Sequence, residues 1–511
     1  MSAESRVKKT LLNARVNIVF YFFTLLLSFF SRKIFLECLS ADFVGLTTTL
    51  YNLLGFLNLA ELGIGTAVGY VLYKPLYEKD HVQINEIISV FGFLYRCVGL
   101  VILIVGVILS LFLPLIFSDI IINLSVVYVA YYSFLVSSLI GYFINYKQTL
   151  LGADQRNYVV SAYFQTSNIL KIIIQLICAY YTRNYYLWIL VELFFGIIYT
   201  FILNWKINQV YPWLKSEPRS GLKLLQKYPN IITLTKQVFI HKIGSFVQYQ
   251  LTPFLVYAFA SLQSVAYYGN YTLLTSKLSG LFSSFLDSSK ASVGNLIAEG
   301  NKEKIMRIYW ELLSIRFLFV SISAIFLYYL IPPFITLWLG SEYVMSRRIL
   351  IMVIIGFALG VLRGTTDEFI SGHGLYRDIW APLVESVIFV VVALVGGTLW
   401  GLEGVLLGGI VSMLIVVYGW KPYFLFKYAL HIPIQTYIRG FVGLFLCTII
   451  GAVIFYVLHN TIDSHLPRSS WIGLICYAIC TGAILSVIQF FILYIGSRGM
   501  RDFVARILHK C

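Results

Sequence analysis

Twenty residues at positions 275–294, TSKLSGLFSSFLDSSKASVG, combine charged and hydroxyl side chains with the length of a membrane-spanning helix. They include two lysines, one aspartate and eight Ser or Thr residues. An ionisable side chain at the centre of a bilayer is costly unless it faces a partner or a wet cavity. Asp287 and Lys290 are three residues apart and can pair on one helix face, but Lys277 has no such neighbour. We therefore interpret Lys277 as a cation that faces a polar cavity.

Other apolar segments also contain isolated charges. Lys242 lies in FIHKIGSFVQYQ near two glutamines, and Lys171 lies well inside NILKIIIQLICAYY. Arg363 and Asp367 in GVLRGTTDEF are four residues apart, which is the spacing of an internal ion pair. The sequence thus predicts several buried cations, of which one already has an obvious partner.

Most of these cations occur in the second half of the chain, and they favour an anionic ligand. The cations of that half are Lys242, Lys277, Lys290 and Arg363. A phosphate or pyrophosphate suits lysine as a point charge and arginine as a bidentate donor. Carboxylates oppose this interpretation, either as ion-pair partners or as groups that couple transport to an ion: Glu61, Glu192, Asp287, Asp367 and Glu368.

No signature of covalent chemistry is found. The sequence has neither a GxxxxGK[ST] loop nor an HExxH pair, and its seven histidines and seven cysteines are scattered. We expect no enzyme activity, metal or cofactor. The glycines of ELGIGTAVGYV, and Gly356, Gly360 and Gly364 at every fourth residue, predict close helix contacts rather than a nucleotide loop.

The composition identifies the kind of protein that must position these residues. The chain has 511 residues, 59% hydrophobic and only 12% charged, with a mean hydropathy of +0.83. Such values lie far outside soluble usage, and long apolar runs indicate an all-α integral membrane protein. The net charge of +15 reflects membrane topology and anionic lipid contact, and it does not imply nucleic acid binding.

Apolar runs bounded by charge or turn residues predict about 14 transmembrane helices. The predicted spans are 15–36, 43–72, 87–117, 124–146, 158–181, 186–204, 237–259, 265–297, 306–331, 349–371, 381–400, 403–425, 440–459 and 471–495. The first run has no cleavage site, so we expect it to be retained. Placing the amino terminus in the cytoplasm puts most Lys and Arg residues on the inside, which predicts that both termini are cytoplasmic.

The chain also contains an internal duplication. The matched pairs are Gly45 and Gly269, Arg96 and Arg316, and Arg156 and Arg377, at separations of 224, 220 and 221 residues. The matches predict two parallel six-helix repeats, at 1–204 and 237–425, joined by a basic linker at 205–236. Residues 426–511 add two helices and a tail. Arg96 and Arg316 lie only about two turns inside their spans, and we expect both to snorkel to the cytoplasmic surface.

Two motifs are similar to those of a known transporter group. SADFVGLTTTLYNLLGFLNLAELGIGTAVGYVLYKPLYEKDHVQINEIISV resembles the early signature of polysaccharide flippases in the multidrug, oligosaccharidyl-lipid and polysaccharide (MOP) exporter superfamily. WGLEGVLLGGIVSMLIVVY resembles the family's glycine-rich entry to span twelve, and the resemblance covers about residues 10 to 425. Glu61 stands where the family more often has aspartate.

The resemblance implies a flippase that alternates between inward-open and outward-open forms in a bacterial inner membrane. Its substrate would be an undecaprenyl-pyrophosphate-linked oligosaccharide for surface polysaccharide synthesis, and membrane lipids and the polysaccharide polymerase machinery would be its partners. We expect Lys242, Lys277, Lys290 and Arg363 to contact the substrate, with Lys171 completing the site. The alternatives are a multidrug extruder that exchanges drugs for cations, a lipid II flippase and, from another class, a membrane polymerase or glycosyltransferase.

Overall fold

The computed structural model describes residues 6–61, 63–118, 120–154, 156–286, 293, 296–297, 299–373, 375, 378–465 and 468–508. These residues form helices joined by short turns, and they contain no strand. The predicted all-α class is therefore confirmed.

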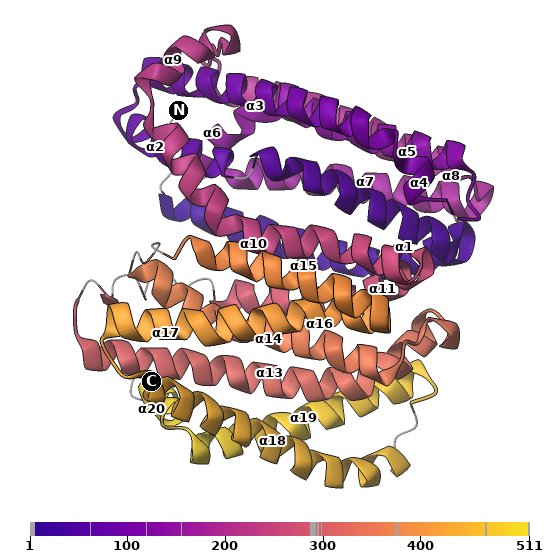
Figure 1. Cartoon of the computed structure of the whole chain (residues 1–511), viewed down its shortest axis with the longest axis vertical. Helices are drawn as coiled ribbons and strands as arrows, with labels where there is room; N and C mark the ends of the chain where they lie inside the picture. Colours follow the sequence, from indigo (N-terminus) through magenta and orange to yellow (C-terminus); the bar gives the residue numbers. More distant parts are fainter. Residues whose placement is uncertain are drawn as a thin grey trace. The chain divides into compact units, whose positions relative to one another are not determined.

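The helices form two compact units, residues 1–266 and 267–511 (Figure 1). The first unit contains α1 (Arg6–Leu57), η1 (Asn58–Glu61), α2 (Ile64–Glu78), α3 (His81–Ser110), α4 (Leu113–Ile116), α5 (Leu124–Ile144), η2 (Asn145–Lys147), α6 (Gln148–Ala153), α7 (Asn157–Thr182), α8 (Tyr185–Val210), η3 (Pro218–Ser220), α9 (Gly221–Lys227) and α10 (Asn230–Phe259). The sequence assigns α10 to the second repeat, but α10 packs on α1 and α2 and belongs to the first unit by contact. The limits of the two repeats stay a prediction.

The boundary between the units falls inside α11 (Leu262–Leu286), and the remaining helices form the second unit. They are α13 (Lys302–Trp338), η4 (Ser341–Tyr343), α14 (Arg347–Gly372), α15 (Trp380–Trp400), α16 (Leu402–Ser412), η5 (Met413–Trp420), α17 (Lys421–Leu425), η6 (Phe426–Leu430), α18 (Ile434–His465), α19 (Trp471–Gly496) and α20 (Arg498–Leu508). The two helices added after the second repeat, α18 and α19, pack on each other and on α13.

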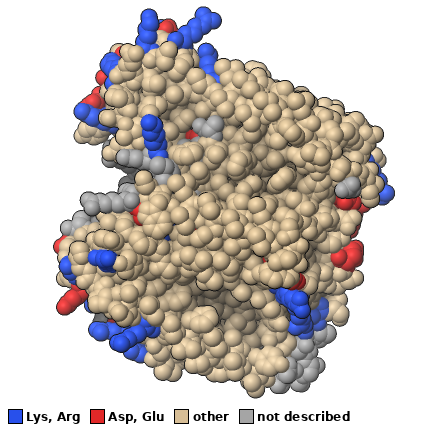
Figure 2. Space-filling view, viewed as in Figure 1, with Lys and Arg blue, Asp and Glu red and all other residues tan. Residues whose placement is uncertain are grey.

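Eleven helical segments among the described residues are long and apolar enough to cross a membrane. They are Val19–Leu57, His81–Ser110, Leu124–Ala153, Tyr158–Thr182, Tyr185–Val210, Lys302–Trp338, Arg347–Gly372, Trp380–Trp400, Leu402–Leu430, Ile434–His459 and Trp471–Gly496. Charged side chains gather near helix ends on the face drawn in Figure 2, with a broad uncharged surface between them. These segments support the predicted membrane protein.

The predicted 14 spans exceed this number for two structural reasons. Two predicted spans, 15–36 and 43–72, share α1, which is interrupted at Ser40, where φ is 74°. The helices α10 and α11 are long enough to span, but they are not among the eleven apolar segments. Their lysine, amide and hydroxyl side chains reduce their hydropathy.

The glycine-rich stretch of predicted span two forms a break in the helix. The helix passes through η1, and Gly63 with φ 102° then starts α2. A Cβ atom at Gly63 would lie 2.8 Å from the Thr235 carbonyl oxygen of α10. Both the positive φ and the close helix approach therefore require glycine here, so the predicted helix contact is confirmed at Gly63. It is wrong for Gly69, where a Cβ atom would meet no described atom within 4 Å.

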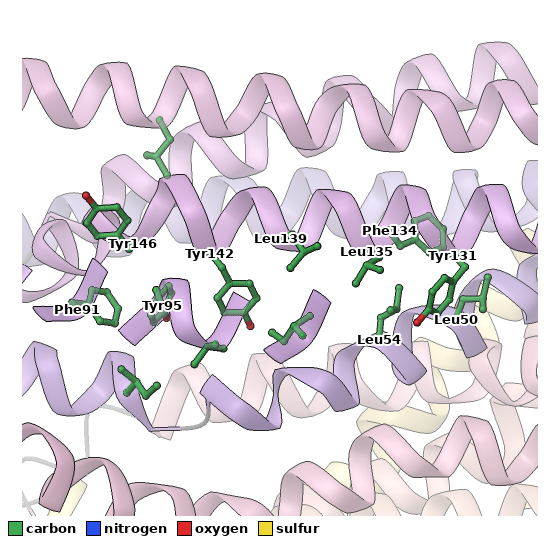
Figure 3. Close-up of a cluster of buried hydrophobic side chains, with 14 of the residues drawn as sticks. Leu50, Leu54, Phe91, Tyr95, Tyr131, Phe134, Leu135, Leu139, Tyr142 and Tyr146 are labelled. Atoms are coloured by element: carbon green, nitrogen blue, oxygen red, sulfur yellow. The ribbon is translucent and has the colours of Figure 1, made fainter. Parts of the chain in front are cut away.

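The core of the first unit is a layer of leucine and aromatic side chains between α1, α3 and α5 (Figure 3). Leu50, Phe91 and Tyr131 are fully buried in it. The hydroxyl of Tyr131 donates to the Gly106 carbonyl at 2.6 Å, so its polar atom is satisfied inside the apolar layer.

The predicted linker lies along α3 in the first unit. The Lys215 amide donates to Asn85 Oδ1 at 2.9 Å, and the Glu217 amide donates to Ser89 Oγ at 2.8 Å. Further along, Lys227 forms an ion pair with Glu86 at 2.6 Å. The linker is thus a docked segment rather than a free tether.

Candidate functional site

The strongest candidate site is a cavity of about 760 Å³ inside the second unit. It lies between α11, α13 and α14, and its lining combines hydroxyl and charged side chains with glycines. The lining residues are Ser279, Ser283, Arg316, Gly360, Val361, Arg363, Gly364, Asp367, Glu368, Ser371 and Gly372. Because α13 and α14 are among the apolar segments, this polar lining stands out against its surroundings.

Arg316 of α13 forms one wall of the cavity together with α14. Its Nη2 atom lies 2.5 Å from Glu368 Oε1, and its Nη1 atom donates to the Val361 carbonyl at 3.2 Å. A Cβ atom at Gly364 would lie 2.5 Å from Arg316 Nη1, so glycine makes room for the guanidinium group. The expectation that Arg316 snorkels to the surface is wrong, because α14 supplies a buried carboxylate within reach. Its matched residue Arg96 is exposed on α3.

Arg363 is held by carboxylates from two helices. Its Nε atom lies 2.8 Å from Asp367 Oδ2, which bears out the pair that the four-residue spacing predicts. Its Nη1 atom lies 3.8 Å from Glu385 Oε1 of α15. The other oxygen of Asp367 accepts a hydrogen bond from Lys421 Nζ at 2.7 Å. Asp367 therefore joins two cations, and Arg363 is not a free charge.

The cavity wall and its immediate surroundings contain three cations and three carboxylates. The cations are Arg316, Arg363 and Lys421, and the carboxylates are Asp367, Glu368 and Glu385. The sequence favoured an excess of positive charge, but the described groups are balanced when all are ionised. Such a balance avoids the cost of an uncompensated buried charge.

This arrangement can still bind an anion, by exchange. A phosphate that enters the cavity can replace a carboxylate as the partner of a guanidinium group, because both present oxygen pairs to the same fork of N–H donors. The carboxylate that is released then needs a proton or a cation of its own. Glu385 is a suitable group for this, because Oε1 accepts no hydrogen bond from the described residues.

Unlike Arg363, the lysines predicted to contact the substrate are not among the described residues that line this cavity. Lys277 lies two residues before Ser279 on α11, roughly 200° around the helix, so it is not on the face that lines the cavity. The side chain of Lys242, and all of Asp287 and Lys290, lie outside the described residues. The substrate contacts of Lys242, Lys277 and Lys290 stay a prediction, as does the role of Asp287 in an ion pair or in ion coupling.

Lys171 is paired within the first unit. Its Nζ atom lies 2.6 Å from Glu192 Oε1, and Gln175 Nε2 donates to the other oxygen of Glu192 at 2.9 Å. This pairing accounts for the burial of Lys171 without any ligand. It argues against a substrate contact, which no observation tests directly.

Glu61 belongs to a separate polar cluster in the first unit. Tyr142 donates to Glu61 Oε2 at 2.6 Å, and Tyr95 donates to Oε1. Figure 3 shows Tyr95 and Tyr142 on neighbouring helices, α3 and α5. The carboxylate at the break between η1 and α2 is thus held by two hydroxyl groups.

The sequence analysis missed Glu385 and Lys421. Both lie inside predicted spans, and that position was the available signal. Their roles depend on contacts between helices: Glu385 is 22 residues from Arg363 along the chain, and Lys421 is 54 residues from Asp367. The three regularly spaced glycines of α14, Gly356, Gly360 and Gly364, also differ from expectation, since a Cβ atom at Gly356 or Gly360 would meet no described atom within 4 Å. Of these three, only Gly364 makes a close approach, and its neighbour is a side chain.

No group of three or more His, Cys, Asp or Glu side chains among the described residues is placed to hold a metal ion.

Comparison with solved structures finds the same architecture in membrane transporters. The lipid II flippase MurJ, in an inward closed conformation, matches with a TM-score of 0.67 over 95% of this chain and 99% of that chain, at 16% identity. An inward-facing multidrug resistance MATE family transporter of the MOP superfamily matches with a TM-score of 0.55 over 78% of this chain and 94% of that chain, at 12% identity. The Vibrio cholerae MATE transporter VcmN matches with a TM-score of 0.52 over 83% and 99%, at 13% identity.

The chain has the fold of these transporters. At such low identity the likeness concerns the fold alone. No protein-family model matches the sequence, and no curated protein sequence matches it. The MATE chains leave a larger part of this chain without a counterpart than MurJ does.

Proposed function

We propose that the protein is a flippase of the MOP type that moves an undecaprenyl-pyrophosphate-linked oligosaccharide across a bacterial inner membrane by alternating access. The observation that carries this proposal is the cavity with Arg316 and Arg363 inside the membrane-spanning part of a transporter fold. The pyrophosphate is the charged part of such a lipid, and it must leave water to cross the membrane. The two guanidinium groups and the Ser279 and Ser283 hydroxyls provide the donors that it needs.

The balanced charges suit a transporter that must also release its substrate. When the cavity is empty, Glu368 and Asp367 neutralise the arginines. When a pyrophosphate binds, it competes with these carboxylates, so net affinity is moderate and can differ between two conformations. Alternating access requires such a difference in affinity between the states. The polyprenyl tail needs no site of its own, because it stays in the bilayer.

A lipid II flippase is the second candidate, and the MurJ match over 95% of this chain favours it. A lipid II substrate would present the same pyrophosphate to the cavity, and it would differ only in the group that the pyrophosphate carries. A multidrug extruder that exchanges drugs for cations would instead rely on Glu385, Glu368 and Asp367. All these functions proceed without covalent chemistry in the cavity.

The experiment measures lipid-linked oligosaccharide on the cytoplasmic leaflet of cells that lack the protein. Wild type should clear the accumulated intermediate, and Arg363→Gln should not. Arg348→Gln is the matched control, since it removes an exposed arginine from the other end of α14. Lys242→Ala and Lys277→Ala test the two lysines that the sequence assigned to the substrate path.

Each outcome of the experiment separates the candidates. Accumulation of lipid II rather than oligosaccharide would identify the second candidate. Raised sensitivity to cationic drugs without any accumulated lipid would overturn both flippase functions. Equal clearance by the Arg363 and Arg348 variants would remove the cavity from the substrate path.

A further inference from the structure

The last helix, α20, is amphipathic, and the apolar side of its helix is only partly covered by protein. Its apolar residues recur at helical spacing: Met500, Phe503, Val504, Ile507 and Leu508. Met500 is 1% exposed, whereas Ile507 is 47% and Leu508 is 69% exposed. The membrane-spanning helix α19 ends at Gly496, and only Ser497 separates it from the start of α20 at Arg498. The uncovered apolar turn therefore lies beside the surface of the membrane, where such helices contact lipid.

Three contacts fix α20 to the start of α13. Arg506 Nη2 lies 2.9 Å from Glu311 Oε2, and the side chain of Glu311 is only 1% exposed. The hydroxyls of Ser314 and Ser497 are 2.9 Å apart. Gly499 packs directly on the backbone of Trp310, where there is no room for a Cβ atom. Figure 1 shows α20 beside one end of α13. The helix is thus docked rather than free to leave the membrane surface.

A cavity of about 630 Å³ lies at this junction, and its lining carries three cations. The lining consists of Asn301, Glu303, Lys304, Met306, Arg307, Trp310, Arg498, Gly499 and Asp502. Lys304 is paired with Glu299 at 2.6 Å. Arg307 and Arg498 form long ion pairs with Glu311 and Asp502, at 3.9 and 3.8 Å, and these distances exceed that of a hydrogen bond. The N–H donors of both guanidinium groups can therefore still bind a closer acceptor.

We propose that this cavity binds the phosphate of an anionic phospholipid, such as phosphatidylglycerol. Arg307 and Arg498, on two different helices, would hold the phosphate, and Trp310 would face the glycerol region. The acyl chains would enter the bilayer beside α13 and α19, whose apolar segments begin and end at this junction. This position at the boundary of the apolar segments favours a lipid over a free phosphate ion, because only the lipid has an apolar part to place in the bilayer. The inference does not depend on what the protein transports.

Trp310 offers a direct test of this site. The full chain is reconstituted in phosphatidylcholine vesicles that contain a fixed fraction of acyl-brominated phosphatidylglycerol or acyl-brominated phosphatidylcholine. The protein has nine tryptophans, so the quenching of Trp310 is obtained by subtracting the signal of Trp310→Phe. One cation near an anionic surface strengthens binding roughly fivefold. We expect phosphatidylglycerol to be preferred at Trp310 by that factor or more.

Two double variants test whether the two arginines cause the preference for phosphatidylglycerol. Arg307→Gln with Arg498→Gln should abolish it, whereas Arg307→Lys with Arg498→Lys should retain it because the charge is kept. Lys74→Gln with Lys223→Gln removes two exposed cations from the first unit and should have no effect. Equal quenching by the two brominated lipids would overturn the proposal. So would a preference that survives in the glutamine variant, or one that inorganic phosphate removes by competition.

Discussion

Arg316 of α13 and Glu368 of α14 form a buried ion pair, with Nη2 2.5 Å from Oε1 and side chains that are only 7% and 6% exposed. The residues are 52 positions apart in the sequence, and the pair links two packed helices at the wall of the cavity. Removal of one partner from such a pair leaves an uncompensated charge, whereas removal of both can be neutral.

Glu368→Ala should therefore be more harmful than the double substitution Arg316→Met with Glu368→Leu. We expect the single variant to lose about 3–5 kcal/mol of folding stability and the double variant to lose much less. Thermal unfolding in one detergent, followed by intrinsic fluorescence, compares the two. If both variants unfold at the same temperature, the pair does not carry the energetic role assigned to it.

Gly364 and Gly360 lie one turn apart in α14 and differ in what surrounds them. Gly364→Ala should displace the Arg316 guanidinium, because the new Cβ atom would lie 2.5 Å from Nη1. We expect a loss of about 1–3 kcal/mol, as for other overpacked sites. Gly360→Ala is the matched control, since a Cβ atom there meets no described atom within 4 Å. The alanine should leave stability unchanged or raise it by up to about 1 kcal/mol, because alanine favours the helix. A reversed order of the two melting temperatures would contradict this.

The membrane fold could be predicted from the sequence because each span is a local property. A run of apolar residues becomes a helix wherever it lies in the bundle, so most predicted spans coincide with observed helices. The charged helices α10 and α11 were also recognised, although hydropathy alone does not single them out. What the sequence did not reveal was the break at Gly63 and the docking of the linker on α3. Both depend on backbone and side-chain contacts between distant segments.

The candidate site likewise combines one contact within a helix, which the sequence predicts, with contacts between distant helices, which it does not. The pair of Arg363 and Asp367 lies within one helix, and its spacing was enough to predict it. The partners Lys421 and Glu385 come from other helices, and no spacing rule connects them to Arg363. Lys277 shows the converse problem, because a lysine near the middle of a predicted span can still lie on a face of its helix that does not line the cavity.

Lys171 provides a prediction that separates pairing from transport. If Lys171 serves only Glu192, then Lys171→Gln and Glu192→Gln should each destabilise the protein, and the double variant should lose less than the sum. Residues in contact show coupling of about 0.5–3 kcal/mol in such a cycle. Folded Lys171→Gln protein should still clear the lipid-linked oligosaccharide at the wild-type rate. If the Lys171→Gln protein is as stable as wild type but clears the lipid-linked oligosaccharide slowly, then Lys171 does contribute to the substrate path.

Glu86 provides the last prediction, since it holds the end of the linker to α3. Lys227 Nζ and the Tyr228 hydroxyl lie 2.6 and 2.5 Å from Glu86 Oε2. Burial and the neighbouring Glu86 raise the pKa of Tyr228, so its hydroxyl stays protonated. The Tyr228 hydroxyl therefore contributes fully below the ordinary value of about 10, and its contribution is lost as the pH rises above that value. The hydrogen bonds from Lys227 and Tyr228 also need the ionised carboxylate of Glu86, so the contact is also lost in acid, where Glu86 becomes protonated.

Glu86→Gln should weaken this docking and expose the linker to trypsin, which cleaves after Lys215, Arg219, Lys223 and Lys227. Since Lys227 is well exposed, we expect a change of roughly 1 kcal/mol, or about fivefold faster cleavage between α8 and α10. Glu78→Gln, which removes a carboxylate paired with Lys74 at 3.8 Å on the exposed side of α2, is the control and should not change the rate. If the two variants are cleaved at the same rate, then the linker is held by its backbone contacts to Asn85 and Ser89 rather than by Glu86.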